Sequence, residues 1–127
     1  MSRAKEIQEN LARVQSEIPK DVKLIVVTKT YPVSDIEILY EAGVRDFGEN
    51  RDHEGSAKAP LIPKDANWHF QGQIQSNKLK SIVEWADYIH SLDDLDHAKK
   101  INKLRKEVIP VFIQVSLDGQ IGRGGIL

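Results

Sequence analysis

The sequence contains no cysteine, carries almost no net charge and has no long apolar run. The lack of cysteine excludes disulfides and thiolate metal sites. Eighteen Lys and Arg residues against nineteen Asp and Glu give a formal net charge of -1, which provides no overall field to attract nucleic acid or an anionic membrane. No apolar stretch approaches the roughly 20 residues of a membrane span, and the N-terminal residues lack the apolar core of a signal peptide. We therefore expect a cytoplasmic protein with no nucleic-acid or membrane partner.

The composition that remains is typical of one globular domain. Of the 127 residues, 40% are hydrophobic and 29% are charged, which is enough apolar surface to build a core. No linker, internal repeat or low-complexity tract divides the chain. We expect a single domain over residues 1–127.

Short apolar runs alternate with segments of helical periodicity along the chain. The first segment, residues 2–17, spaces its apolar residues as one helical face, and Ser2 is a suitable N-cap. The runs after it have almost no polar alternation, which is typical of strands covered on both faces in a parallel sheet. The pattern predicts strands at residues 22–28, 44–47, 68–71, 88–90 and 108–117.

Helices are predicted between these strands. Ser34 and Glu37 have the spacing of a capping box at the start of the first of them. The segment between residues 47 and 60 is weakly patterned but helical in character, and two clearer helices are predicted at residues 76–85 and 93–106.

This alternation predicts an α/β fold of the (β/α)8 TIM-barrel type. The last predicted strand leads into a glycine-rich segment with no helix behind it, although a buried parallel strand needs a covering helix and a neighbour. Five strands cannot close an eight-stranded barrel. We therefore expect an incomplete barrel made of about the first five βα strands, which is prone to self-association at its open edge.

Polar side chains collect at the predicted carboxyl ends of the strands, the edge where (β/α) barrels hold their active sites. Polar residues also simply resume where strands end, and this ordinary explanation covers most single positions. Lys29 stands apart because it follows a strongly apolar strand directly. An amine enclosed by an apolar rim deprotonates readily, and the neutral amine forms a Schiff base with an aldehyde or ketone. Alternatively, the Lys29 side chain reaches the rim and pairs with Glu49 or Asp46.

Asn50, His69 and Ser91 are predicted to reach the same edge as Lys29. Asn50 offers a donor and an acceptor to a ligand, or caps the helix that follows it. His69 alternates with apolar neighbours on its strand, which favours a packed, hydrogen-bonded ring over an acid or base. The four histidines share no ligand-like spacing, so no metal site is expected.

Five motifs in order resemble one known family. They are VVTKTYP, AGVRDFGEN, WHFQGQIQSNK, IHSLD and VFIQVSLDG, and they extend over essentially the whole chain. These motifs resemble the pyridoxal 5'-phosphate homeostasis proteins, whose barrel is similar to the N-terminal domain of alanine racemase. Family members continue for roughly another hundred residues, so the resemblance is to their N-terminal portion. The motif after Asn50 departs from the family, because RDHEG stands where many members have an apolar residue and a Gln-Glu pair.

The resemblance implies pyridoxal 5'-phosphate as cofactor, held as a Schiff base on Lys29. Because Asn50, His69 and Ser91 are predicted to reach the same edge as Lys29, we expect them to be further cofactor-binding residues. It implies a monomeric protein that balances the pools of cofactor and amino acids without catalytic turnover, and no catalytic residue. Two alternatives stay open. One is a racemase-like or other Schiff-base enzyme, and the other is a truncated barrel that binds no ligand and in which Lys29 pairs with a carboxylate.

Overall fold

The computed structural model describes residues 2–126, and within them the strands form one five-stranded parallel sheet in the order β1-β2-β3-β4-β5. The strands are β1 (Val26–Val27), β2 (Asp46–Glu49), β3 (Asn67–Phe70), β4 (Tyr88–Leu92) and β5 (Val111–Ile113). The helices are α1 (Arg3–Glu17), α2 (Val33–Glu41), α3 (Asp52–Lys58), α4 (Leu79–Trp85) and α5 (Leu95–Leu104), with short 3-10 turns η1 (Ala59–Leu61) and η2 (Ser76–Lys78). The predicted alternation of strands and helices is confirmed.

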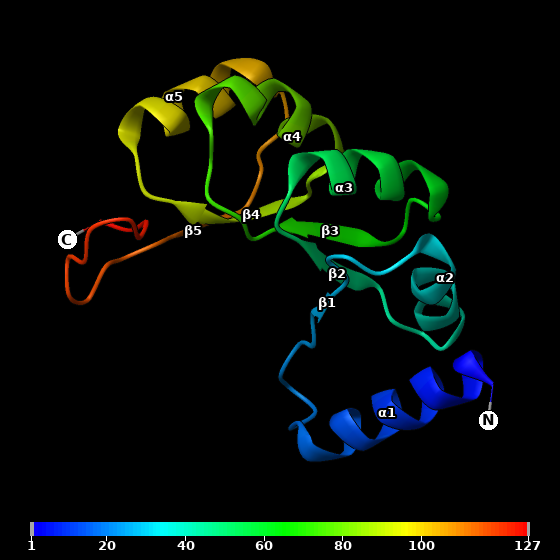
Figure 1. Ribbon diagram of the computed structural model, residues 1–127. Coiled ribbons are helices and arrows are strands. Elements are labelled where there is room, and N and C mark those ends of the chain that lie inside the picture. Colours follow the sequence, from blue (N-terminus) through cyan, green and yellow to red (C-terminus); the bar gives the residue numbers. More distant parts are fainter. Residues whose placement is uncertain (1, 127) are drawn as a thin grey trace.

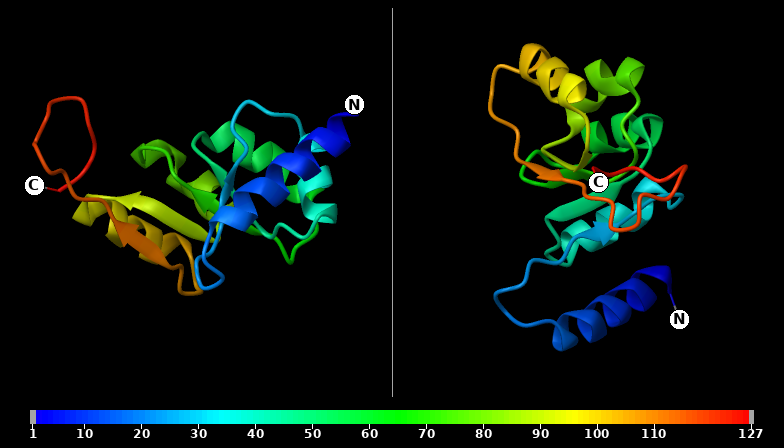
Figure 2. Two further views of the ribbon diagram at one scale, coloured as in Figure 1. Left: turned by 90° about the horizontal axis from the view of Figure 1, so that it is seen from below. Right: turned by 90° about the vertical axis from the view of Figure 1, so that its left-hand side faces the viewer.

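The strands form an open, curved sheet whose helices lie on one face (Figures 1 and 2). Helices α2 to α5 follow the strands in turn, while α1 lies beside α2 at the β1 end. Since each strand pairs in parallel with the next one along the chain, every βα unit repeats the same step around the curve. This is the arrangement of successive units in a (β/α) barrel.

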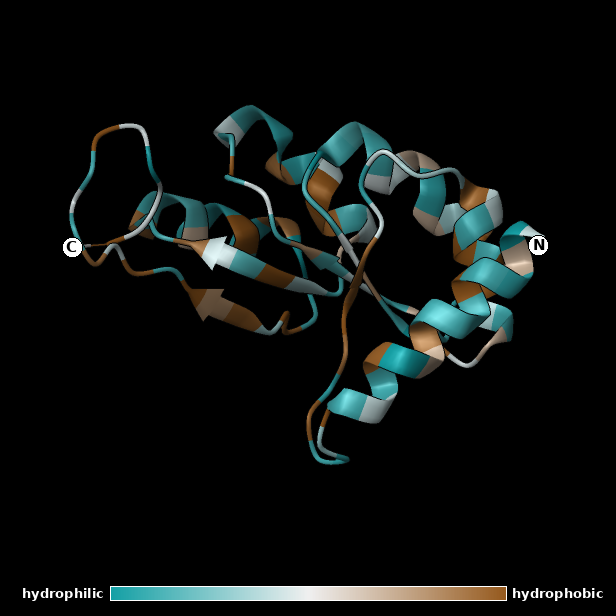
Figure 3. Cartoon of the chain, turned by 60° about the horizontal axis from the view of Figure 1, so that its bottom comes forward, coloured by the Kyte–Doolittle hydropathy of each residue, from teal (hydrophilic) through white to brown (hydrophobic). Residues whose placement is uncertain are grey.

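The hydrophobic core fills the space between the sheet and these helices. Its most enclosed side chains come from strands and helices alike, namely Ile36, Phe47, Leu79, Ile82 and Ile89. The opposite face of the sheet is more open, and Val27 on β1 and Phe112 on β5 are 48% and 59% exposed. Figure 3 shows the apolar residues of β5 at the free end of the sheet.

The outer strands are much shorter than the apolar runs that predicted them. Strand β1 has two residues in place of the predicted 22–28, and β5 has three in place of 108–117. Both strands lie at edges of the sheet and pair on one side only. Because β2 begins at Asp46, the residues of the apolar run that precede β1 have no strand partner. After β5 the chain folds back, and Val115 pairs with Ile126 in a single bridge.

The first helix matches its prediction, but the start of α2 does not. Ser2 caps α1 by accepting a hydrogen bond from the Lys5 backbone N–H. The capping box predicted at Ser34 and Glu37 is wrong, because α2 begins at Val33 after Pro32 and Ser34 already lies within the helix. An ion pair between Arg3 and Asp35, 2.9 Å long, instead joins α1 to the first turn of α2. A carboxylate near a helix N-terminus is favoured by the helix dipole.

No helix within residues 2–126 has both the length and the apolar content needed to cross a membrane.

Candidate functional site

Lys29 lies in a tight turn directly after β1. The Thr28 backbone N–H donates to the Gly48 carbonyl at 2.9 Å, which continues the β1-β2 ladder to the edge of the sheet, and Tyr31 N–H closes the turn on the Thr28 carbonyl at 3.1 Å. The turn requires Thr30 to adopt a left-handed backbone with φ of +66°. A β-branched residue in this region costs on the order of 1–3 kcal/mol and persists only where its surroundings impose it.

The Lys29 side chain is exposed, which corrects the prediction that an apolar rim encloses it. The alternative that Lys29 pairs with Glu49 or Asp46 is also contradicted, because Glu49 bonds to Lys58 and Asp46 to His69. No carboxylate of the described residues forms an ion pair with Lys29. The strand that leads into the turn, β1, is at the edge of the sheet and pairs with β2 alone among the described strands.

Asn50 directly follows β2, the strand that pairs with β1 through Val26 with Phe47 and Val27 with Gly48. Lys29 and Asn50 therefore come after the carboxyl ends of two neighbouring parallel strands. The Asn50 side-chain Oδ1 is buried without a hydrogen-bond partner among the described residues. A buried polar atom without a partner costs free energy, and such atoms mark places where a ligand or water completes the bonding. Asn50 does not cap α3, whose N-cap is Arg51.

A buried cluster of charged residues lies under the Lys29 turn, on the helix-covered face. Its centre is Lys58 of α3, which is only 8% exposed. Lys58 Nζ donates to the Thr28 carbonyl at 2.9 Å, to Glu49 Oε2 at 3.0 Å and to Glu54 Oε2 at 3.0 Å. Since an ammonium has three protons, these contacts use its full donor capacity. The Thr28 hydroxyl also donates to Glu49.

Glu54 links this cluster to the strained residue of the turn. Its Oε2 accepts the Thr30 backbone N–H at 2.8 Å and also the Lys58 ammonium. The Thr30 N–H and the Lys58 charge hold the pKa of Glu54 below its usual range, against the opposing effect of partial burial. The carboxylate is therefore ionised at neutral pH and accepts both bonds, so the turn is tied to α3 as well as to β2.

His69 belongs to a second polar group, on the open face of the sheet. His69 Nε2 lies 2.9 Å from Asp46 Oδ1, and His69 Nδ1 lies 2.8 Å from His90 Nε2. The Tyr88 ring stacks on the His69 ring with centroids 4.4 Å apart. The expectation of a packed, hydrogen-bonded histidine is confirmed, since both ring nitrogens of His69 have protein partners.

We expect the free energy of unfolding to decrease as the pH is lowered, because of His90. Burial and the nearby charge of His69 lower the pKa of His90 below 6.5. The unfolded chain therefore takes up a proton at a higher pH than the folded one, so stability is full above about pH 6.5 and falls as the pH drops below it. Asp46 and Lys23 are the other charged groups at this cluster.

Urea unfolding at a series of pH values measures this dependence. We expect His90→Gln to reduce the slope of the unfolding free energy against pH below about pH 6.5, by at most the slope that the uptake of one proton produces. His53→Gln, at an exposed histidine, is expected to leave that slope unchanged. Equal slopes in the wild type and His90→Gln contradict the assignment.

Ser91 is buried and faces away from the open side of the sheet. It alternates with His90 along β4 and shares the helix-covered face with Ile89, and its hydroxyl donates to the Gly72 carbonyl. The structure thus places Lys29 and Asn50 after the ends of the neighbouring strands β1 and β2. It places His69 deeper on the open face and Ser91 against the loop after β3.

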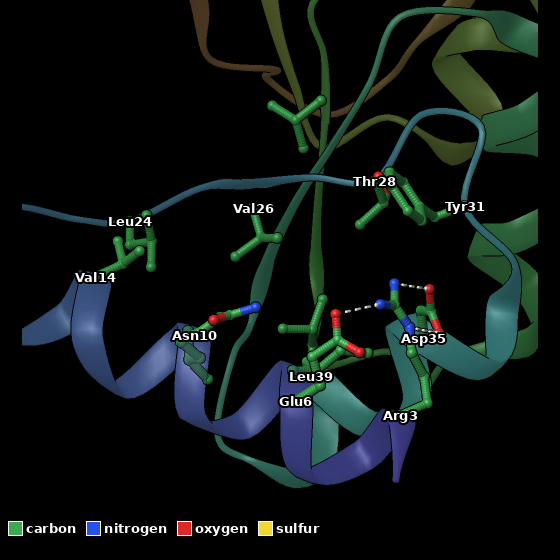
Figure 4. Close-up of a pocket in the computed structure, with 13 residues that line it drawn as sticks. Arg3, Glu6, Asn10, Val14, Leu24, Val26, Thr28, Tyr31, Asp35 and Leu39 are labelled. Atoms are coloured by element: carbon green, nitrogen blue, oxygen red, sulfur yellow. Dashed lines mark hydrogen bonds and ion pairs between the residues drawn. The ribbon is translucent and has the colours of Figure 1, made fainter. Parts of the chain in front are cut away.

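Two hollows adjoin the strand ends. One of about 500 Å³ lies between the loops after β2 and β3, and Asn50, Gln73 and Lys78 are among its lining residues. The other, of about 420 Å³, lies between α1 and β1, and Figure 4 shows Val26, Thr28 and Tyr31 on one side of it and Arg3 on the other. Its walls are mostly apolar, and it lies on the helix-covered face of β1, away from the side of the sheet that bears His69. No group of three or more metal-ligating side chains with suitable placement occurs in the described residues.

Sequence reasoning missed the charged cluster. Glu54 and Lys58 are four residues apart on one helix, a spacing at which a glutamate and a lysine pair. That signal was present in the sequence. The position of both side chains under Thr28 and Thr30 could not be read from the sequence, because it depends on how α3 packs on the sheet.

The family model described as "Alanine racemase, N-terminal domain" matches residues 3–127. The chain belongs to this family. Among curated relatives in the family, the pyridoxal phosphate homeostasis protein of Corynebacterium glutamicum is 44% identical over 114 residues, covering 82% of this chain and 51% of that protein. The corresponding protein of Synechocystis is 44% identical over 93 residues, covering 72% of this chain and 43% of its own length.

Solved structures of relatives agree with the fold. The structure of PipY of Synechococcus elongatus without pyridoxal 5'-phosphate (PLP) superposes with a TM-score of 0.87 at 38% identity, covering 94% of this chain and 58% of PipY. The structure of PipY with PLP bound gives a TM-score of 0.84 with similar coverage, 94% and 57%. The resemblance drawn from the motifs and the (β/α)-barrel fold class are both confirmed. The chain spans about half the length of the curated relatives in this family.

Proposed function

We propose that this chain is the cofactor-binding N-terminal portion of a pyridoxal 5'-phosphate homeostasis protein, and that Lys29 holds the cofactor as a Schiff base. The names of the relatives and the PLP-bound structure of PipY support the cofactor class. The observation that carries the residue assignment is the place of Lys29 and Asn50 after the carboxyl ends of the neighbouring strands β1 and β2. Lys29 offers an exposed amine without a carboxylate partner among the described residues, and Asn50 offers a buried Oδ1 without a hydrogen-bond partner there.

These residues fit the cofactor chemically. When bound, pyridoxal 5'-phosphate supplies an aldehyde that condenses with an amine. Lys29 Nζ, as the neutral amine, forms the new C–N bond while the aldehyde oxygen leaves as water. Asn50 has an amide that donates to or accepts from a polar group held next to that nitrogen.

His69 and Ser91 support this site from within the protein. The His69 nitrogens bond to Asp46 and His90, which fixes the ring on the open face. The Ser91 hydroxyl bonds to Gly72 and ties the loop after β3 to β4. We propose that Lys29 and Asn50 contact the cofactor, whereas His69 and Ser91 hold the surface and loop around it.

The role we propose is binding rather than turnover. The relatives' names describe homeostasis and no reaction. We further propose that the sheet is the first part of an eight-stranded barrel whose remaining strands cover β1 and β5.

Reductive trapping tests the proposal. The chain is incubated with pyridoxal 5'-phosphate, reduced with borohydride, digested and mapped by mass spectrometry. We expect the adduct on Lys29, its loss in Lys29→Met, and unchanged labelling in Lys20→Met, which alters an exposed lysine in a loop. Labelling spread evenly over the exposed lysines, or an unlabelled Lys29 at saturating cofactor, overturns the proposal.

A further inference from the structure

The Lys29 turn is held by bonds to both of its flanking residues. Thr28 bonds through its carbonyl to Lys58 and through its hydroxyl to Glu49, while Thr30 donates its backbone N–H to Glu54 at 2.8 Å. Lys29 itself makes no such bond among the described residues. The direction in which the Lys29 side chain leaves the sheet therefore depends on what fixes its neighbours.

Thr30 is the point where the turn is strained. It has a φ of +66°, a conformation that a threonine adopts at a cost and glycine adopts freely. The hydrogen bond between Tyr31 and Thr28 closes the turn but leaves the Thr30 N–H without a backbone partner. Glu54 supplies that partner from a different element, α3, 24 residues further along the chain.

Glu54 is in turn held in place by Lys58. The Lys58 ammonium bonds to Glu54 Oε2 at 3.0 Å and lies one helical turn away on α3. The Glu54 and Lys58 side chains are only 13% and 10% exposed, so solvent screens this pair less than it does a surface pair. The carboxylate thus meets the Thr30 N–H from a fixed position.

We propose that Glu54, fixed by Lys58, is a positioning residue that holds Thr30 in the left-handed conformation and thereby aims Lys29 across the strand ends. This inference rests on the proposed function, because it assigns Glu54 a role toward the amine that binds the cofactor. Without the hydrogen bond from Thr30 to Glu54, Thr30 relaxes to a negative φ, and the peptides on either side of it rotate.

The first test makes no use of the cofactor. Hydrogen exchange at the Thr30 amide is followed by NMR in the cofactor-free chain. Loss of a bond to a charged acceptor accelerates exchange, and we expect about tenfold or more in Glu54→Ala. Glu54→Gln keeps a side-chain oxygen and is expected to show a smaller effect, while Glu84→Ala, at an exposed glutamate of α4, shows none. An unchanged Thr30 exchange rate in Glu54→Ala overturns the inference.

The second test uses rescue. We expect Glu54→Ala to slow the trapping of pyridoxal 5'-phosphate on Lys29 about tenfold. The double variant Glu54→Ala, Thr30→Gly is expected to recover most of that loss, because glycine reaches positive φ without Glu54. Acetylation of Lys29 by acetic anhydride controls for general amine reactivity. A double variant that traps no faster than Glu54→Ala shows that Glu54 supports only the fold, and overturns the inference.

The two proposals fail in different ways. If wild-type Lys29 is not labelled but Thr30 exchange responds to Glu54→Ala as described, the positioning of the turn stands and the cofactor role of Lys29 fails. If Lys29 is labelled equally in the wild type and Glu54→Ala, the cofactor role stands and the positioning role fails.

Discussion

Lys58→Met is expected to lower the free energy of unfolding by about 3–5 kcal/mol, the usual cost of breaking a buried ion pair from one side. The Lys58 ammonium is the only cation that bonds to Glu49 within the described residues, and Glu49 is 0% exposed. Glu49 Oε1 already lacks a partner. Removing Lys58 leaves a fully buried carboxylate with the Thr28 hydroxyl as its main remaining donor. It also takes away one of the two donors to the Thr28 carbonyl, which keeps the Tyr31 N–H.

A loss of this size is a large part of the stability of one domain, which is typically about 5–15 kcal/mol. Urea unfolding and thermal melting measure it. The matched control is Lys80→Met, at an exposed lysine of α4, which we expect to change stability by less than about 0.5 kcal/mol.

A second variant separates charge from packing. Glu49→Gln combined with Lys58→Met removes both charges of the Glu49–Lys58 pair, and we expect it to be more stable than Lys58→Met alone because the fully buried charge of Glu49 is no longer left unpaired. If the single and double variants are equally unstable, loss of packing rather than an unpaired charge explains the effect.

The fold was predictable because its signals are local and repeated. Apolar runs broken by helical periodicity gave the order of elements, and the central strands β2, β3 and β4 lie within about two residues of their predicted bounds. The edges were not predictable in the same way. An apolar run becomes a strand only where a partner offers hydrogen bonds, and β1 and β5 each have a partner on one side only.

The candidate site was predictable in type but not in detail. Lys29 was expected at a strand end and lies there, but its burial depends on what covers β1 and could not be deduced from the residues around it. Ser91 and His90 are adjacent in sequence and point to opposite faces of the sheet, so a list of polar residues at strand ends mixes two environments. The strained φ of Thr30 has no sequence signal, because threonine is not a residue that marks a left-handed turn.

Gly72→Ala is expected to disturb the site through the backbone. A Cβ at residue 72 is placed 2.0 Å from the Asn50 carbonyl oxygen and 2.8 Å from the Asn50 carbonyl carbon. These are backbone atoms of the loop that follows β2, so no side-chain rotation relieves the overlap, and the loops after β2 and β3 must separate. We expect a loss of about 1–3 kcal/mol in the free energy of unfolding, the range for forced overpacking.

The same substitution is expected to weaken cofactor trapping on Lys29 by more than its effect on stability explains. Separating the two loops moves Asn50, whose buried Oδ1 we assign to the cofactor, and pulls the Gly72 carbonyl away from Ser91. The control is Gly124→Ala, where the nearest atoms to a new Cβ are the ends of the Asp93 and Gln114 side chains at 3.2 Å and beyond. Trapping at conditions where both variants are fully folded decides the point. If Gly72→Ala then labels Lys29 as fast as Gly124→Ala does, Asn50 has no part in binding, and the cofactor contact must be assigned to Lys29 alone.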